Sequence, residues 1–103
     1  MKFSANLGLL WSELPLLDRV YKAKEKNFDA IEFQFPYEVD ANELKKAIDN
    51  INLPIIGINT IKGDVSKGDN GLNAIPSKVE EARVAIDQAI EYAKVIGAKN
   101  IHF

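Results

Sequence analysis

The sequence contains no cysteine, which excludes disulfides, thiolate nucleophiles and cysteine-based metal sites. It has no apolar run near the roughly 20 residues that a membrane-spanning helix needs, and its first residues are too weakly basic and too interrupted for a signal peptide. Basic residues are not in excess either: the formal net charge is −2, without a concentrated basic surface to hold nucleic-acid phosphates. We therefore expect a cytoplasmic protein whose partners include neither a membrane nor a nucleic acid.

Apolar residues make up 47% of the 103 residues, enough for the core of one domain, which we place at 1–103. Short strand-like segments alternate with amphipathic helix-like segments along this domain. The strands are predicted at about 3–7, 30–34, 55–59 and 100–103, and the helices at about 14–26, 41–50 and 77–96. This alternation predicts an α/β fold with right-handed crossovers and a parallel sheet.

The predicted helix ends carry recognisable signals. Asp40 is suited to cap the second helix. Ser77 and Glu80 have the spacing of a capping box at the start of the third helix, and Gly97 is suited to end it in a left-handed conformation.

Side chains alternate between the two faces of a strand, so each predicted strand divides into two sets. One set is apolar, as the face beneath the helices requires: Phe3, Ala5, Leu7, Ile31, Phe33, Ile56, Ile58, Ile101 and Phe103. The other carries polar groups in every strand: Ser4, Asn6, Ala30, Glu32, Gln34, Ile55, Gly57, Asn59, Asn100 and His102. Doubly wound sheets are covered on both faces and have mostly apolar strands. A polar second face instead favours a (β/α)8 TIM barrel, whose interior is lined by the strands and whose ligand site lies at their C-terminal ends.

A complete barrel has eight strands and about 250 residues. Four predicted strands correspond to a half-barrel, the N-terminal part of a larger barrel, with unpaired sheet edges and an uncovered inner face. Because unpaired edges are templates for pairing with another chain, we expect a homo-oligomer that forms through the open edges.

Four side chains of the polar face are the candidates for a substrate pocket: Asn6, Glu32, Asn59 and His102. Each also has an ordinary structural explanation. Glu32 either pairs with a lysine or backbone group or accepts a hydrogen bond from a substrate hydroxyl, because a carboxylate within a strand needs a partner. Asn6 and Asn59 either satisfy turn backbone or bind a sugar, and His102 is either a packing residue or part of the pocket.

The long irregular stretch at 60–76 is predicted to be a mobile lid over the pocket. Gly63, Gly68 and Gly71 permit the unusual backbone angles of such a loop. Asp64 either caps a turn within it or contacts the ligand. The glycines and acidic residues match neither a calcium-binding EF-hand nor a P-loop, so neither of those sites is predicted.

Three aromatic residues follow the predicted strands and are candidates for the wall of the pocket: Trp11, Phe35 and Tyr37. Large, rigid rings at such positions suit either a pocket wall or a contact between subunits. The sequence leaves both alternatives open.

Several segments carry a family resemblance that spans nearly the whole chain. "FSANLGLLWSELPLLDR", "FDAIEFQFPYEVDANELK" and "GINTIKGDVSKGDNGLNAIPSK", together with the terminal "IHF", resemble the hydroxypyruvate isomerase family, which includes 2-oxo-tetronate isomerases and belongs to the xylose isomerase-like TIM barrels. The chain departs from the family pattern at Asp69 and Asn70, where glutamate and an aromatic residue are common. It departs again at Pro76-Ser77-Lys78, where the family has Pro-Gly-Arg.

The resemblance implies aldose–ketose isomerisation of a small sugar acid through an enediol-like intermediate. It also implies a divalent metal in the full-length parent and two glutamates that act as acid and base, all of them beyond Phe103. No catalytic residue, metal ligand or cofactor is therefore assigned within 1–103, and the isolated chain is expected to be inactive. The alternative is a non-catalytic half-barrel module that self-associates or complements a partner, and a weaker one is an endonuclease-like or epimerase activity, the former disfavoured by the acidic charge balance.

Overall fold

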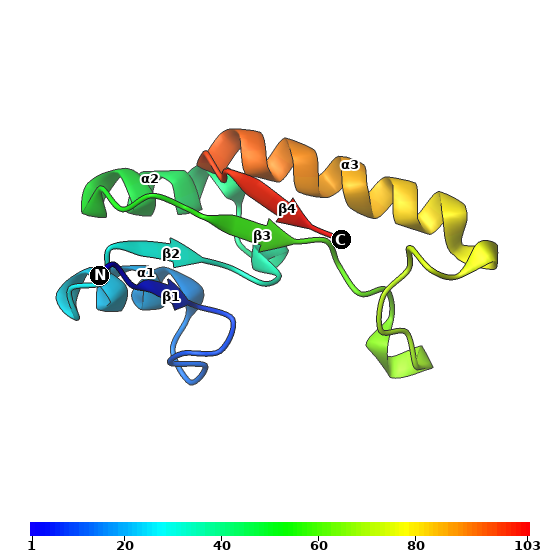
Figure 1. Ribbon diagram of the computed structural model, residues 1–103, viewed down its shortest axis with the longest axis horizontal. Coiled ribbons are helices and arrows are strands. Elements are labelled where there is room, and N and C mark those ends of the chain that lie inside the picture. The colour runs from blue at the N-terminus through cyan, green and yellow to red at the C-terminus, as the bar shows by residue number, and fades with distance from the viewer.

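The computed structural model describes all residues from Met1 to Phe103. Strands and helices alternate along the chain (Figure 1), in the order β1 (Ser4–Asn6), α1 (Leu16–Glu25), β2 (Ala30–Glu32), α2 (Ala41–Ile51), β3 (Gly57–Asn59), α3 (Val79–Ile96) and β4 (Asn100–His102). Three short 3-10 turns lie at Pro36–Glu38, Val65–Lys67 and Pro76–Lys78. Each strand has three residues, fewer than predicted from the sequence.

The strands pair in parallel, which confirms the predicted α/β class. β1 pairs with β2, and β3 pairs with β4. β2 and β3 are joined by a single bridge between Ile31 and Ile55, so the expected continuous sheet is divided into two parallel pairs. All three helices lie on one side of the strands, and the opposite side is uncovered (Figure 1).

An irregularity between β2 and β3 explains that division. The N–H of Ile31 donates to the carbonyl of Pro54, but the N–H of Phe33 donates to Gly57, so β3 advances three residues while β2 advances two. This is a β-bulge, which is uncommon between parallel strands. The extra residue reverses the predicted alternation: Ile55 is 2% exposed in the core, whereas Ile56 is 38% exposed on the uncovered face.

The core lies between the strands and the helices. Its largest fully buried side chains come from the strands and their ends and from all three helices: Leu7, Val20, Ile31, Leu44, Ile58 and Ile96. Two residues predicted for this apolar face, Phe3 and Phe103, are instead exposed. Phe3 precedes the first residue of β1 and Phe103 follows the last residue of β4, so both lie outside the part of the strands that the helices cover.

Two of the predicted helix-end signals are present in the structure and one is not. The Asp40 carboxylate accepts the N–H groups of Asn42 and Glu43 at the start of α2, and Gly97 ends α3 in the left-handed region with φ 77°. The capping box at Ser77 is wrong, because the 3-10 turn from Pro76 occupies that position and α3 begins at Val79 without a side-chain cap. None of the helices combines the length and the apolar character that a membrane span requires.

Candidate functional site

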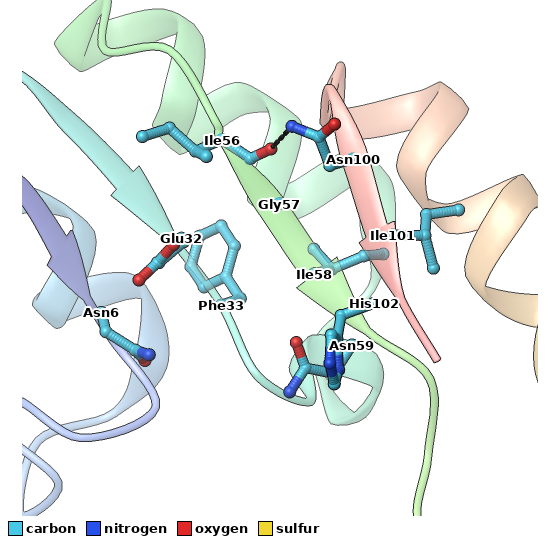
Figure 2. A pocket seen from close by; sticks show the side chains of 10 residues that line it. All are labelled: Asn6, Glu32, Phe33, Ile56, Gly57, Ile58, Asn59, Asn100, Ile101 and His102. Carbon is cyan, nitrogen blue, oxygen red and sulfur yellow. Dashed lines mark hydrogen bonds between the residues drawn. The ribbon is translucent and has the colours of Figure 1, made fainter.

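A hollow of about 500 Å³ lies on the uncovered side of the strands, and we call it the polar hollow. Figure 2 shows the side chains that line it: Asn6, Glu32, Phe33, Ile56, Gly57, Ile58, Asn59, Asn100, Ile101 and His102. All four candidates from the sequence are among them. Each of the four is the last residue of its strand, which places them together at the C-terminal end of the parallel strands.

The strand register explains this convergence. Asn6 is opposite Glu32 across the β1–β2 pair, and Asn59 is opposite His102 across the β3–β4 pair. Figure 2 shows the first two side chains on one side of the hollow and the other two on the far side. The bulged junction between β2 and β3 lies between them.

Glu32 and Asn6 have free hydrogen-bonding capacity toward the hollow. The Asn6 side-chain oxygen accepts the N–H of Gly8 at 2.9 Å, which is the turn role expected of asparagine, and its side-chain amide has no partner in the chain. The half-buried Glu32 carboxylate has neither a hydrogen bond nor an ion pair within the chain. A half-buried carboxylate without a protein partner is available to accept hydrogen bonds from a ligand.

Asn59 and His102 are held by their backbone and leave their side chains free. The N–H of Asn59 donates to the Gln34 carbonyl at 2.9 Å, and its own carbonyl accepts the Tyr37 hydroxyl. The carbonyl of His102 accepts the N–H of Thr60 at 2.9 Å. Neither the Asn59 amide nor the His102 imidazole forms a hydrogen bond within the chain.

Asn100 has a role in the hollow that the sequence did not single out. Its side-chain amide donates to the carbonyl of Ile56 at 2.9 Å, drawn as the dashed line in Figure 2. The bulge deprives that carbonyl of its ladder partner, because Phe33 donates to Gly57 instead. Asn100 therefore satisfies the backbone group that the bulge exposes. In the sequence, Asn100 was marked only as a second polar residue, beside His102, on the polar face of β4.

The three candidate aromatics lie in three different environments, and only one of them lines a pocket near the strand ends. Trp11 packs edge-to-face against Phe28, with ring centroids 6.1 Å apart, and lies outside the polar hollow. The turn at residues 7–14 places Trp11 against the core, and its role as a pocket wall stays a prediction. Tyr37 is half-buried behind Asn59, and Phe35 lines a second pocket.

This second pocket, about 420 Å³, lies between the strand ends and the 60–76 loop, and we call it the loop pocket. It shares Asn59 and His102 with the polar hollow. The other residues that line it are Phe35, Thr60, Ile61, Lys62, Asn70, Gly71, Leu72, Asn73, Ala74, Ile75 and Phe103. Lys62 is its only Lys, Arg, Asp or Glu side chain, and sequence reasoning did not identify it. Its place three residues after the end of β3 was the available signal.

The loop itself is internally bonded. Asp64 accepts the N–H of Ser66 at 3.0 Å and so caps the turn at Val65–Lys67, the structural alternative considered for it. Gly63, Gly68 and Gly71 all have positive φ, and a Cβ at Gly63 would lie 2.6 Å from the Asp69 carboxylate. Leu72 is 4% exposed and packs with Ala82 and Ala85 of α3, which anchors the loop. Motion of this loop as a lid stays a prediction.

Two tyrosines connect α3 to the end of β3. The Tyr92 hydroxyl donates to the carbonyls of Pro36 and Val39, and the Tyr37 ring packs edge-to-face against Tyr92 at 5.2 Å. Burial raises the pKa of Tyr37 to about 12. Burial raises the pKa of Tyr92 to about 12, followed by the negative charge of Asp40 and the charge that Tyr37 gains when it loses its proton at alkaline pH. Both hydroxyls therefore stay protonated and able to donate across the neutral pH range.

The residues of this chain do not make a metal centre. Glu32 and His102 are the only Asp, Glu, Cys or His side chains that line the polar hollow, and nowhere do three such side chains lie close enough together to hold a metal ion. A divalent cation needs more ligands than these two provide.

Comparison with known proteins gives a consistent family. A family model described as xylose isomerase-like TIM barrel matches residues 20–103. The chain is 42% identical to the 2-oxo-tetronate isomerase of Haemophilus influenzae over 101 residues, which cover 98% of this chain and 39% of that protein. It is 38% identical to the hydroxypyruvate isomerase of Escherichia coli over 102 residues, which cover 99% of this chain and 40% of that protein.

A solved structure agrees with this placement. The chain superimposes on the crystal structure of an AP endonuclease, family 2, from Brucella melitensis with a TM-score of 0.91 and 34% sequence identity. The match covers 98% of this chain and 39% of that one. The chain thus spans about two fifths of the length of the proteins that it matches.

Proposed function

The chain belongs to the xylose isomerase-like TIM barrel family, and on that premise we propose that it forms one wall of the substrate site of a sugar-acid isomerase. The observation that carries the proposal is the position of Asn6, Glu32, Asn59 and His102, each at the C-terminal end of its strand and all in one hollow. Ligand sites of TIM barrels form at this end of the strands. The names of the relatives add the substrate class, a short 2-oxo acid with hydroxyl groups.

The free groups of the hollow suit such a substrate. The Glu32 carboxylate accepts hydrogen bonds from hydroxyl groups, and the amides of Asn6 and Asn59 donate to hydroxyl or carbonyl oxygens. His102 presents an imidazole that either donates or accepts, depending on its tautomer. These groups suit the wall to bind and orient a polyhydroxy ligand, beside the apolar side chains of Phe33, Ile56, Ile58 and Ile101 that also line the hollow.

In this isomerisation a proton leaves the hydroxyl-bearing carbon next to the carbonyl, and a proton is added to the carbonyl carbon. The transfer requires a positioned base and acid. The hollow offers one carboxylate and one imidazole, on opposite sides of the bulged junction. We assign the proton-transferring pair to residues outside 1–103, as the family resemblance implies, and give this chain the binding role.

A second candidate function rests on a different observation, the uncovered face of the strands. A chain whose strand edges and inner face are open is suited to self-association or to complementing a partner polypeptide. An endonuclease activity, which the structural neighbour from Brucella melitensis carries in its name, is less suited to this hollow, since no Lys or Arg side chain lines it to hold a phosphate backbone.

Titration of the isotope-labelled chain with hydroxypyruvate, followed by amide chemical shifts, tests the binding role. We expect shifts confined to the ends of the four strands, with millimolar affinity. Asn59→Ala removes one ligand hydrogen bond and should weaken binding about 5–10-fold, which corresponds to the ~1 kcal/mol of a neutral hydrogen bond. Asn42→Ala, at an exposed asparagine on α2 without side-chain hydrogen bonds, is the matched control and should leave affinity within about twofold.

The same samples test the assignment of the proton-transferring pair. In deuterated buffer, hydroxypyruvate should exchange its carbon-bound protons no faster with the chain than without it. Faster exchange would place a working base within 1–103. Shifts that are absent at high ligand concentration, or that appear only on the helices, would refute the binding role.

A further inference from the structure

The polar hollow and the loop pocket are adjoining spaces of opposite charge. They meet at Asn59 and His102, which line both. Glu32 is the only Asp, Glu, Lys or Arg side chain of the polar hollow, and Lys62 is the only one of the loop pocket. A ligand that spans the two spaces therefore meets an anionic end and a cationic end.

Lys62 is available to bind an anion. Its ammonium lies 5.2 Å from the centre of the Phe35 ring, a cation–π contact that holds a flexible side chain over the pocket. It has no ion pair or side-chain hydrogen bond in the chain. The acidic residues of the same loop are engaged elsewhere: Asp64 caps a turn and lies 3.9 Å from the Lys67 ammonium, and Asp69 accepts the N–H of Asp64.

We propose that Lys62 binds the carboxylate of the substrate, so that a sugar acid lies with its carboxylate in the loop pocket and its hydroxyl-bearing carbons over the polar hollow. The inference rests on the proposed function and adds to it the orientation of the substrate and the residue that selects acids over neutral sugars. A short 2-oxo acid has the matching polarity, with an anion at one end and hydroxyls, which suit Glu32, at the other. Its carbonyl, which lies between them, falls near Asn59 and His102.

Charge explains why Lys62 determines specificity. A lysine ammonium beside a carboxylate forms a charge-assisted hydrogen bond, which is stronger than the neutral hydrogen bonds that the asparagines offer. The reversed orientation would bring the substrate carboxylate toward Glu32, and two like charges brought close together repel. The two pockets therefore favour one orientation of an anionic ligand and give no such advantage to a neutral one.

The test compares two ligands that differ only at the end facing Lys62. Hydroxypyruvate carries a carboxylate where dihydroxyacetone carries a neutral hydroxymethyl group. Lys62→Met keeps an unbranched chain over the Phe35 ring and removes the charge. We expect this variant to bind hydroxypyruvate about 10-fold more weakly, equivalent to ~1.4 kcal/mol, and to bind dihydroxyacetone as the unmodified chain does.

Two further variants make the result specific. Lys67→Met removes the same charge from the same loop at an exposed side chain outside the loop pocket, and should leave both affinities unchanged. Lys62→Arg keeps the charge and should retain most of the preference for the acid. Affinities are measured by amide shifts at low and raised salt, and the acid preference of the unmodified chain should shrink as salt screens the interaction.

Each outcome decides one question. If the unmodified chain does not bind hydroxypyruvate at the strand ends, the proposed function itself fails. If it binds but Lys62→Met retains the full affinity for the acid, or loses affinity equally for both ligands, the carboxylate role of Lys62 is overturned. An equal loss in Lys67→Met would attribute the effect to net charge and overturn it as well. Should Lys62→Met lose its native spectrum, Lys62→Gln serves the same comparison.

Discussion

Tyr92 provides a single-residue link between α3 and the site, and its hydroxyl carries a measurable share of the stability. It is 9% exposed and donates to the carbonyls of Pro36 and Val39. Tyr92→Phe leaves both carbonyls without that donor and should lower the free energy of unfolding by about 1–2 kcal/mol, measured by urea denaturation at neutral pH. Tyr21→Phe, at an exposed tyrosine bonded only to Asn50, is the matched control and should change it by no more than about 0.5 kcal/mol.

The same tyrosines determine an alkaline pH dependence. Because burial raises the pKa of Tyr37 and Tyr92 from 10 to about 12, the folded chain holds these protons more tightly than the unfolded chain. Their contribution is therefore complete below pH 10 and is lost as the pH rises from about 10 to 12. The unmodified chain and Tyr92→Phe share every other titratable group, so the difference between them isolates the tyrosine effect. A loss of stability equally steep in both proteins would contradict it.

Helix α2 and helix α3 begin in different ways, and paired alanine variants distinguish them. The Asp40 carboxylate accepts two N–H groups of α2, whereas the hydroxyl of Ser77 caps nothing because α3 starts two residues later. Asp40→Ala should therefore lower the free energy of unfolding by about 1 kcal/mol. Ser77→Ala should change it by less than about 0.5 kcal/mol. Equal losses of unfolding free energy in the two variants, measured by urea denaturation, would instead support the capping box expected from the sequence.

The alternation of side chains was predicted correctly along β1 and β4 but not at the bulge before β3. Strict alternation along β1 and β4 placed Asn6 and His102 on the uncovered side, because an uninterrupted strand repeats every two residues. The same rule failed between Ile55 and Ile56, where a bulge inserts one residue. A bulge depends on the pairing of two strands and leaves no periodic signal in either one. Ser77 illustrates the same limit at a helix start. Ser77 and Glu80 have the spacing of a capping box, but a 3-10 turn that begins at Pro76 occupies this position.

Across the whole molecule, the order of elements and the family were predictable, because they depend on many residues that agree. The grouping of the four polar candidates could also be predicted, because parallel strands have their C-terminal ends at the same edge. Its position just after β3 marked Lys62 only weakly, and the loop pocket around it could not be predicted, since it arises from the fold of the 60–76 loop against β3 and β4. Side chains of long loops meet through tertiary contacts that no local period encodes.

The uncovered face leads to a prediction about association of the 103-residue chain. Ile56 is 38% exposed on this face, and the outer edges of β1 and β4 have no strand beside them. Exposed apolar side chains next to unpaired parallel edges favour contact with a second copy. We therefore expect a concentration-dependent increase in sedimentation coefficient, and Ile56→Lys should shift the equilibrium toward the monomer by placing a charge in that contact.

Val84 provides the matched control for this prediction, since it is 67% exposed and lies on α3, which covers the opposite side of the strands. Val84→Lys makes the same apolar-to-charged change and should leave association as it is in the unmodified chain. If both lysine variants reduce association equally, the cause is net charge, and the uncovered face is not the contact. A monodisperse monomer at high concentration would contradict association altogether. Because Ile56 also lines the polar hollow, association through this face should compete with hydroxypyruvate, so added ligand should shift the unmodified chain toward the monomer.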